Sequence, residues 1–385
     1  MKTLIKSNKY DSLVNSILYC AFFIHQLFFI FSVSEFATSV AGVKRIAQFI
    51  IIISFFVMCL TALYYFLRGK FSAKEIAIYT ILAIPLLISL YNYRVVMVVS
   101  NLFYAAIFKN VDIDKGLKVA LYAIILGYAI NVLISIFTRY TGNVGQLRYG
   151  VSRIRYGLGF RYAYFTGYYY MTIVLIYILV HDRLKIIEYV MLTALNLLVF
   201  ILSDAKGAFV YTMVALVLHL MFVRFNLNYL SKIFKIFVVA AFPIAALIAI
   251  LLPAFYVQGN NIWDMLNRIL TGRLRLTHNA LIDCGWKWFG QTAKLWDPGV
   301  HYADSSIVLM LIQNGLIVLI MSIAFMTLFS YMAVKINHKP LMIVLFVIAL
   351  RSTFDMGFMT MQLGPVIIMF YDVLNKYRNG VVCDY

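Results

Sequence analysis

Residues 233–253, IFKIFVVAAFPIAALIAILLP, decide the fold of this chain. Beyond Lys235 the run has no charged side chain, and an α-helix needs about 20 apolar residues to cross the hydrocarbon core of a bilayer. Because lipid offers no hydrogen-bond partners, the backbone groups of such a run must be satisfied within a helix. The run therefore predicts a transmembrane helix.

Similar apolar runs recur along the whole chain, which has 385 residues, 64% of them hydrophobic and 12% charged. Soluble domains carry roughly 25% charged residues, so this chain has too little charge to cover a surface in water. The continuous runs also exclude a transmembrane β-barrel, whose strands alternate. We expect an all-α, polytopic integral membrane protein with a single transmembrane domain over 1–385. The predicted spans, about twelve by length, are 12–33, 46–67, 75–92, 95–109, 116–138, 162–181, 187–203, 207–223, 233–253, 304–333, 340–355 and 358–374.

Positive charge sets the predicted orientation. The chain has 33 Lys and Arg against 15 Asp and Glu, a formal net charge of +18. Short Lys-rich clusters occur in alternate connections, and cytoplasmic loops of membrane proteins carry such clusters. With these clusters inside, both termini are cytoplasmic.

Two connections on the opposite, external side break this rule. The Arg-rich external loop, 139–161, has only arginines as basic residues and no acidic residue, and the large external loop, 254–303, mixes basic residues with Trp and Asn. Smaller external turns add Lys206 and Arg351. The basic residues of the two loops are Arg139, Arg148, Arg153, Arg155, Arg161, Arg268, Arg273, Arg275, Lys287 and Lys294.

External arginines repel one another, so a bound anion is the simplest compensation. Guanidinium is a planar fork that binds phosphate through two hydrogen bonds, which favours a diphosphate at the outer surface. The glycines of 139–161 would let backbone amides approach a phosphate. The alternative is contact with anionic lipid headgroups, which accept lysine equally well. No P-loop, Rossmann or metal-ligand spacing is present, so we expect no metal, cofactor or nucleic acid.

The large external loop is expected to contain short helices. NNIWDMLNRIL at 260–270 has apolar residues at helical spacing, which predicts a helix on the membrane surface. In the next segment, 273–285, Arg275 and His278 share one helical face that could meet a sugar ligand. Trp286 and Trp288 either anchor the loop at the interface or stack on a sugar.

His301 and Asp304 stand where the 304–333 run begins. Asp304 either satisfies amides at the start of that helix or acts as a general base. A base would accept the proton of a sugar hydroxyl while arginines stabilise the departing diphosphate; His301 is the other candidate for this role. Asp355, beside Arg351, is expected to form a local ion pair.

At this point the layout resembles the Wzy-type O-antigen and capsule polymerases and the related O-antigen ligases. Those proteins are similar in having about a dozen spans, cytoplasmic termini, an Arg-rich external loop in mid-chain and a larger one before the last three spans. The local patterns that agree are GLGFRYAY at 157–164, SDAKG at 203–207, TGRLRL at 271–276 and DSSIVLMLIQNG at 304–315.

The resemblance implies a metal-independent, C-type glycosyltransferase that joins undecaprenyl-diphosphate-linked oligosaccharides at the outer face of the bacterial plasma membrane. It implies capsule or exopolysaccharide synthesis alongside a flippase and a chain-length regulator. Lys206 departs from the Arg that relatives often have, and Asp304-Ser305 replaces the His-Asn pair of ligases, which favours a polymerase. The diphosphate-binding set implied by the family pattern is Arg161, Lys206, Arg268 and Arg273, to which Arg153, Arg155 and Arg275 are added as neighbouring guanidinium groups.

Two other functions remain open at this point. A ligase would transfer finished glycan to another acceptor. A lipid-linked oligosaccharide flippase would line its membrane interior with charge and often shows repeated halves. The spans here are nearly free of charge and no internal repeat is apparent.

Overall fold

The computed structural model describes residues 9–93, 97–148, 151–293, 296–297, 301–355 and 364–383. Within these ranges nearly all regular structure is α-helical, and eight helices are long and apolar enough to cross a membrane. The chain is thus an all-α membrane protein, which confirms the predicted class. The count of twelve spans stays a prediction.

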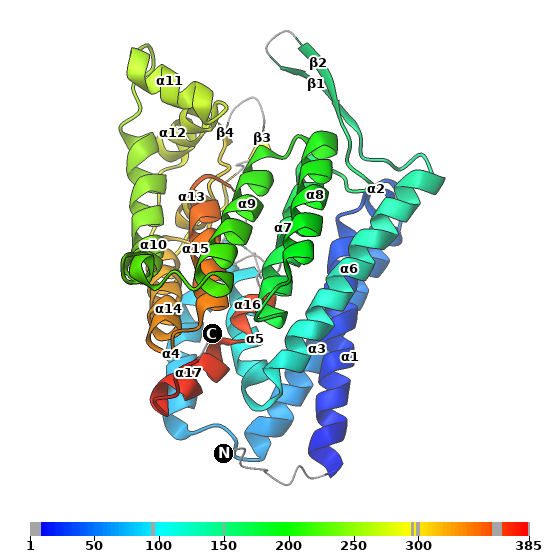
Figure 1. The fold of residues 1–385 in the computed structure, drawn as a ribbon, viewed down its shortest axis with the longest axis vertical. Helices are drawn as coiled ribbons and strands as arrows, with labels where there is room; N and C mark the ends of the chain where they lie inside the picture. Colours follow the sequence, from blue (N-terminus) through cyan, green and yellow to red (C-terminus); the bar gives the residue numbers. More distant parts are fainter. Residues whose placement is uncertain are drawn as a thin grey trace. The chain divides into compact units, whose positions relative to one another are not determined.

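The helices form two compact units (Figure 1). Unit 1 comprises residues 1–71, 103–217 and 365–372, and unit 2 comprises 72–102, 218–364 and 373–385. The elements lying mainly in unit 1 are α1 (Lys9–Ser32), α2 (Glu35–Ser39), α3 (Val43–Leu67), the 3₁₀ helix η1 (Phe108–Asn110), α6 (Ile113–Phe137), β1 (Val144–Arg148), β2 (Val151–Arg155), α7 (Ala163–Val180), α8 (Ile186–Ser203) and α9 (Lys206–His219).

The elements of unit 2 begin with a helix remote in sequence from the rest. They are α4 (Ala73–Tyr93), the π-helix η2 (Leu220–Arg224), α10 (Asn228–Ala254), α11 (Asn261–Ile269), α12 (Arg273–Cys284), β3 (Trp296–Asp297), β4 (His301–Tyr302), α13 (Ser306–Gln313), α14 (Leu316–Lys335) and α15 (Lys339–Phe354). The last two residues of α9 belong to unit 2, and three further helices also include residues of both units: α5 (Met97–Ile107), α16 (Gly364–Ile367) and α17 (Phe370–Arg378).

In unit 1, α1 packs against α3 and α6, and α7 packs against α6 and α8. Phe160, at the end of the Arg-rich loop, is fully buried in this core and stacks on Tyr169 with ring centroids 5.2 Å apart. An apolar anchor of this size fixes the end of the loop, because burying a phenylalanine stabilises by about 1.5–3 kcal/mol.

In unit 2, α10 packs against α14 and α15, and α12 packs against α10 and α13. α4 contributes a polar contact in which the Asn314 amide Nδ2 donates to the Ser89 hydroxyl at 3.2 Å. α13, α14 and α15 follow one another in the chain and contact one another in pairs, so the segments before α13 and after α15 can meet at one place.

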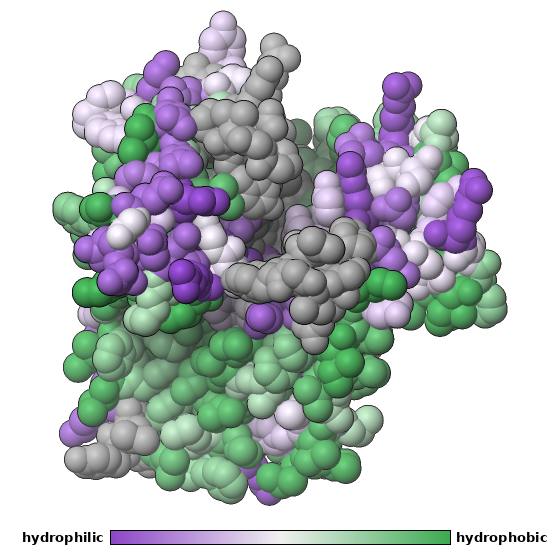
Figure 2. Space-filling model, turned by 90° about the horizontal axis from the view of Figure 1, so that it is seen from above, coloured by the Kyte–Doolittle hydropathy of each residue, from purple (hydrophilic) through white to green (hydrophobic). Residues whose placement is uncertain are grey.

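Many helices expose large apolar side chains. On α3, Phe49, Ile52 and Phe56 lie at helical spacing and are 63%, 65% and 61% exposed. Such a stripe is costly in water and stable in hydrocarbon. Figure 2 shows broad hydrophobic areas on the visible surface, with hydrophilic residues gathered in separate patches.

The predicted helix 304–333 is wrong in one respect, because the structure breaks it into α13 and α14 at Asn314-Gly315. Gly315 has φ +94°, and a Cβ there would lie 2.3 Å from the amide nitrogen of Gly290. Because the backbone at Gly290 passes so close to Gly315, the helix is broken at this glycine. The predicted span 358–374 falls partly outside the described residues; within the described part, α16 and α17 are separate helices.

The Arg-rich loop contains an antiparallel hairpin that the sequence analysis did not predict. β1 pairs with β2 with Val144 opposite Arg155, Gln146 opposite Arg153 and Arg148 opposite Val151. The register therefore places positions 148, 153 and 155 on the same face of the ribbon.

Candidate active site

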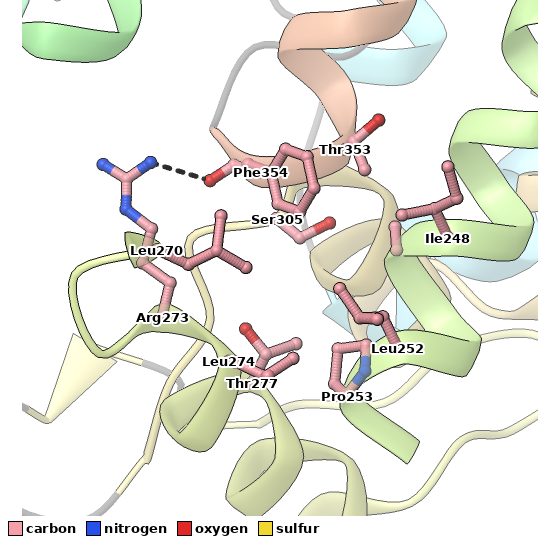
Figure 3. Close-up of a pocket in the computed structure, with 11 residues that line it drawn as sticks. Ile248, Leu252, Pro253, Leu270, Arg273, Leu274, Thr277, Ser305, Thr353 and Phe354 are labelled. Carbon is pink, nitrogen blue, oxygen red and sulfur yellow. Dashed lines mark hydrogen bonds between the residues drawn. The ribbon is translucent and has the colours of Figure 1, made fainter. Parts of the chain in front are cut away.

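A three-residue ion-pair cluster in unit 2 joins the start of α12 to the segments flanking α13 and α15. The Arg273 Nε lies 3.0 Å from Asp304 Oδ2, and its Nη1 lies 2.5 Å from Asp355 Oδ1. The same Nη1 donates to the Phe354 carbonyl at 3.0 Å (Figure 3). One guanidinium is thus shared by two carboxylates, and the three side chains by themselves carry a formal charge of −1.

The turn between α11 and α12 presents Arg273 to these carboxylates. Thr271 (φ +58°) and Gly272 (φ +84°) both adopt left-handed backbone conformations, and Gly272 caps α12. The Gly272 amide donates to Asn267 at 2.7 Å and ends α11. Arg273 becomes the first residue of α12, with its side chain about one-third exposed.

Hydrogen bonds between α13 and α15 bring Asp304 and Asp355 to the same guanidinium. The Ser306 amide donates to the Asp355 carbonyl at 3.2 Å, and the Ser305 and Ser306 hydroxyls donate to the Ser352 carbonyl. Ser305, not Asp304, is the residue whose side chain caps α13, accepting from the Val308 amide. Ser305 therefore has the capping role that was one of the two expectations for Asp304.

The two carboxylates differ in accessibility. The Asp355 side chain is 4% exposed and the Asp304 side chain 18%. Asp355 pairs with Arg273, a residue remote in sequence, which the expected local ion pair with Arg351 did not include. Asp304 is therefore the more accessible carboxylate of the two, and Asp355 is the more deeply buried one.

A small cavity lies against Arg273 and Ser305 (Figure 3). Its water-accessible volume is about 20 Å³, which is room for about one water molecule and not for a sugar. The remaining lining residues are Ile248, Ala249, Leu252, Pro253, Leu270, Leu274, Thr277, Thr353 and Phe354.

Two further arginines of the predicted diphosphate set lie on the same helix pair. Arg268 near the end of α11 and Arg275 on α12 are exposed, and within the described residues neither guanidinium has an ion-pair partner. Unlike Arg273, these two cations are available to an anion.

The predicted sugar-binding residues differ in how far they are held by protein contacts or exposed. The His278 Nδ1 is 2.8 Å from the Pro253 carbonyl, and its ring packs edge-on against Tyr256, so one face of α12 is fixed to the end of α10. Trp286 and Trp288 are 52% and 58% exposed, with centroids 5.8 Å apart. The His301 backbone, in β4, pairs with that of Asp297 in β3, and the His301 side chain lies outside the described part.

In unit 1, Arg155 is anchored to the protein. Its Nε donates to the Ser203 carbonyl at 2.8 Å and its Nη2 to the Asp204 carbonyl at 3.3 Å. A cation at a helix C-terminus is favourable, so this contact fastens the hairpin to the end of α8. Arg155 is thereby a structural residue as well as a predicted ligand.

Arg161 and Lys206 are exposed. The Arg161 guanidinium lies 5.2 Å from the Tyr162 ring centroid, and Lys206 is the first residue of α9, directly after the α8–α9 turn that Arg155 contacts. The structure thus brings Arg155 and the Lys206 segment together. The Arg153 side chain lies outside the described part.

Two glycines of the Arg-rich loop, Gly157 and Gly159, serve packing. The Gly159 amide donates to the Thr141 carbonyl and the Gly157 amide to the Asn143 side chain. A Cβ at Gly159 would lie 1.9 Å from the Asn131 carbonyl oxygen, at φ +84°. These amides are engaged by protein acceptors, so the expected phosphate contact by glycine amides is not supported here.

Comparisons with known proteins found no match: no protein-family model, no curated protein and no solved structure matches this chain.

Proposed function

We propose that this chain is a glycosyltransferase that joins undecaprenyl-diphosphate-linked oligosaccharide repeat units at the outer face of the bacterial plasma membrane. The observation that carries the proposal is the accessible Asp304 carboxylate, held by Arg273 at the start of α13 beside helices that expose further arginines. The sequence resemblance to Wzy-type polymerases points the same way. About twelve spans and cytoplasmic termini belong to the proposal.

In the proposed reaction, Asp304 accepts the proton of the terminal hydroxyl of one lipid-linked unit. The hydroxyl oxygen forms a bond to the anomeric carbon of a second lipid-linked chain. The bond between that carbon and its diphosphate oxygen breaks, and the electron pair leaves with undecaprenyl diphosphate. External cations stabilise the charge that develops on the diphosphate.

Arg273 has a different role in this scheme from the other arginines. Because two carboxylates already surround it, an approaching diphosphate would meet a net negative cluster. Arg273 therefore acts as a positioning residue that fixes the Asp304 carboxylate, and Asp355 fixes Arg273. The diphosphates are assigned to the exposed cations that have no ion-pair partner within the described residues: Arg268, Arg275, Arg161 and Lys206.

Purified protein in detergent, incubated with a lipid-diphosphate-linked repeat unit, tests this function. A product ladder at repeat-unit spacing with release of undecaprenyl diphosphate is expected. Substrate binding without a ladder would contradict a polymerase. Transfer to a separate acceptor would then identify a ligase, and movement across a vesicle bilayer without any product would identify a flippase.

A further inference from the structure

α11 exposes an apolar face although it lies outside the spans. Ile262, Met265 and Ile269 are 67%, 56% and 66% exposed, and their spacing of three and four residues puts them on one side of the helix. None of the nine residues of α11 is buried. A helix of this kind has no folding reason to be apolar on one side unless something covers that side.

The position of α11 suggests what covers it. The preceding span α10 ends at Ala254, and the Asn260 side chain starts α11 by accepting from the Ile262 and Trp263 amides. Only the segment 255–260 separates the two helices. Figure 1 shows α11 running across the axis of α10 beyond its end, where the polar surface of a bilayer would lie.

The surrounding side chains fit a headgroup layer. The four tryptophans of the chain are Trp263, Trp286, Trp288 and Trp296, all within 254–303. Tryptophan concentrates at membrane interfaces because its ring is apolar while its N–H needs a polar partner. The spans use Phe and Tyr as their aromatic residues, so this distribution separates the loop from the hydrocarbon-facing helices.

The exposed charged side chains around α11 and α12 indicate which kind of lipid surface the loop would bind. Arg268, Arg275 and Lys287 are exposed around α11 and α12. The acidic residue of α11, Asp264, accepts from the Tyr256 hydroxyl at 3.2 Å. The loop therefore presents apolar and cationic groups together, which is complementary to anionic lipid headgroups over acyl chains.

We propose that the apolar face of α11, with Trp286 and Trp288, docks into the headgroup layer of an anionic lipid bilayer. In this docked position, Arg268 lies at the depth of the phosphates of membrane lipids. The inference concerns lipid contact alone and goes beyond the proposed glycosyltransferase activity. Its test therefore does not depend on that activity.

The natural protein carries its own probe, because every tryptophan belongs to this loop. The full chain is placed in vesicles of phosphatidylglycerol and phosphatidylcholine brominated near the carboxyl end of the acyl chains, and tryptophan fluorescence is compared with that in unbrominated vesicles. We expect strong quenching that weakens when phosphatidylglycerol is left out. A variant keeping only Trp263 assigns the signal to α11.

Met265→Asp should lose most of the quenching, since a carboxylate resists entry into the interface. Gln258→Asp is the matched control, because it adds the same charge at an exposed position of the same loop without removing an apolar contact, and it should keep the quenching. Quenching by aqueous iodide but not by bromolipid would overturn the proposal. Protection from both quenchers would also overturn it and would point to a second copy or another protein on this face.

Discussion

Arg273 and Asp355 lie 82 residues apart in the chain, and Nη1 of the first is 2.5 Å from Oδ1 of the second. This contact orients the guanidinium whose Nε binds Asp304 at 3.0 Å. The buried Asp355 carboxylate is therefore linked to the more accessible Asp304 carboxylate through one rigid group, the Arg273 guanidinium. The planar fork of arginine can do this because its nitrogens are fixed relative to one another.

Asp355→Asn should lower kcat by about tenfold or more, because a general base that loses its orientation forfeits much of a contribution of roughly 10²–10⁴. KM for the lipid-linked unit should stay nearly unchanged, since Asp355 does not face substrate. Steady-state ladder formation separates the two constants. Asp283→Asn, an exposed change on α12, the helix that begins with Arg273, is the control. A rise in KM with unchanged kcat would show that Asp355 acts on binding instead.

Arg273→Lys should be as inactive as Arg273→Ala, because an ammonium group cannot hold both carboxylates in the fork geometry. Relative activity of the two variants, normalised to folded protein, measures this. Substantial rescue by lysine would mean that only a point charge is needed at this position.

Arg268→Ala and Arg275→Ala should each raise KM by about tenfold, as expected from losing a charge-assisted hydrogen bond worth roughly 1.5 kcal/mol. The defect relative to wild type should shrink with added salt, because salt screens the attraction between these exposed side chains and the diphosphate, which only the wild type retains. Titration of KM against salt concentration provides the readout. A loss of kcat with unchanged KM for both variants would show that the two arginines act in the chemical step and not in diphosphate binding.

Gly159→Ala and Gly259→Ala form a matched pair. Both glycines have φ near +85°, so each substitution carries a backbone cost of about 1 kcal/mol. Only at Gly159 would the new Cβ meet backbone, 1.9 Å from the Asn131 carbonyl oxygen; at Gly259 nothing lies within 4 Å. Thermal unfolding should therefore show a much lower Tm for Gly159→Ala. Equal Tm values would contradict the close packing of the Arg-rich loop.

The sequence was sufficient for the helical membrane class, since uncharged runs such as 233–253 leave few alternatives. It did not reveal the break at Gly315, which depends on the passage of Gly290 from a distant segment. It also missed Asp355 as the partner of Arg273, because no local pattern marks a pair so far apart. The hairpin had a signal that was not used: two alternating runs, 144–148 and 151–155, flank Tyr149-Gly150.

Asp304→Asn tests the central claim most directly. Asparagine keeps the size of the side chain but cannot accept the hydroxyl proton as a carboxylate does. At saturating lipid-linked repeat unit, purified Asp304→Asn protein should bind the substrate with near-normal affinity and form no ladder, while wild-type protein forms one. A ladder of normal rate and length from Asp304→Asn would contradict Asp304 as the proton acceptor and with it the proposed mechanism.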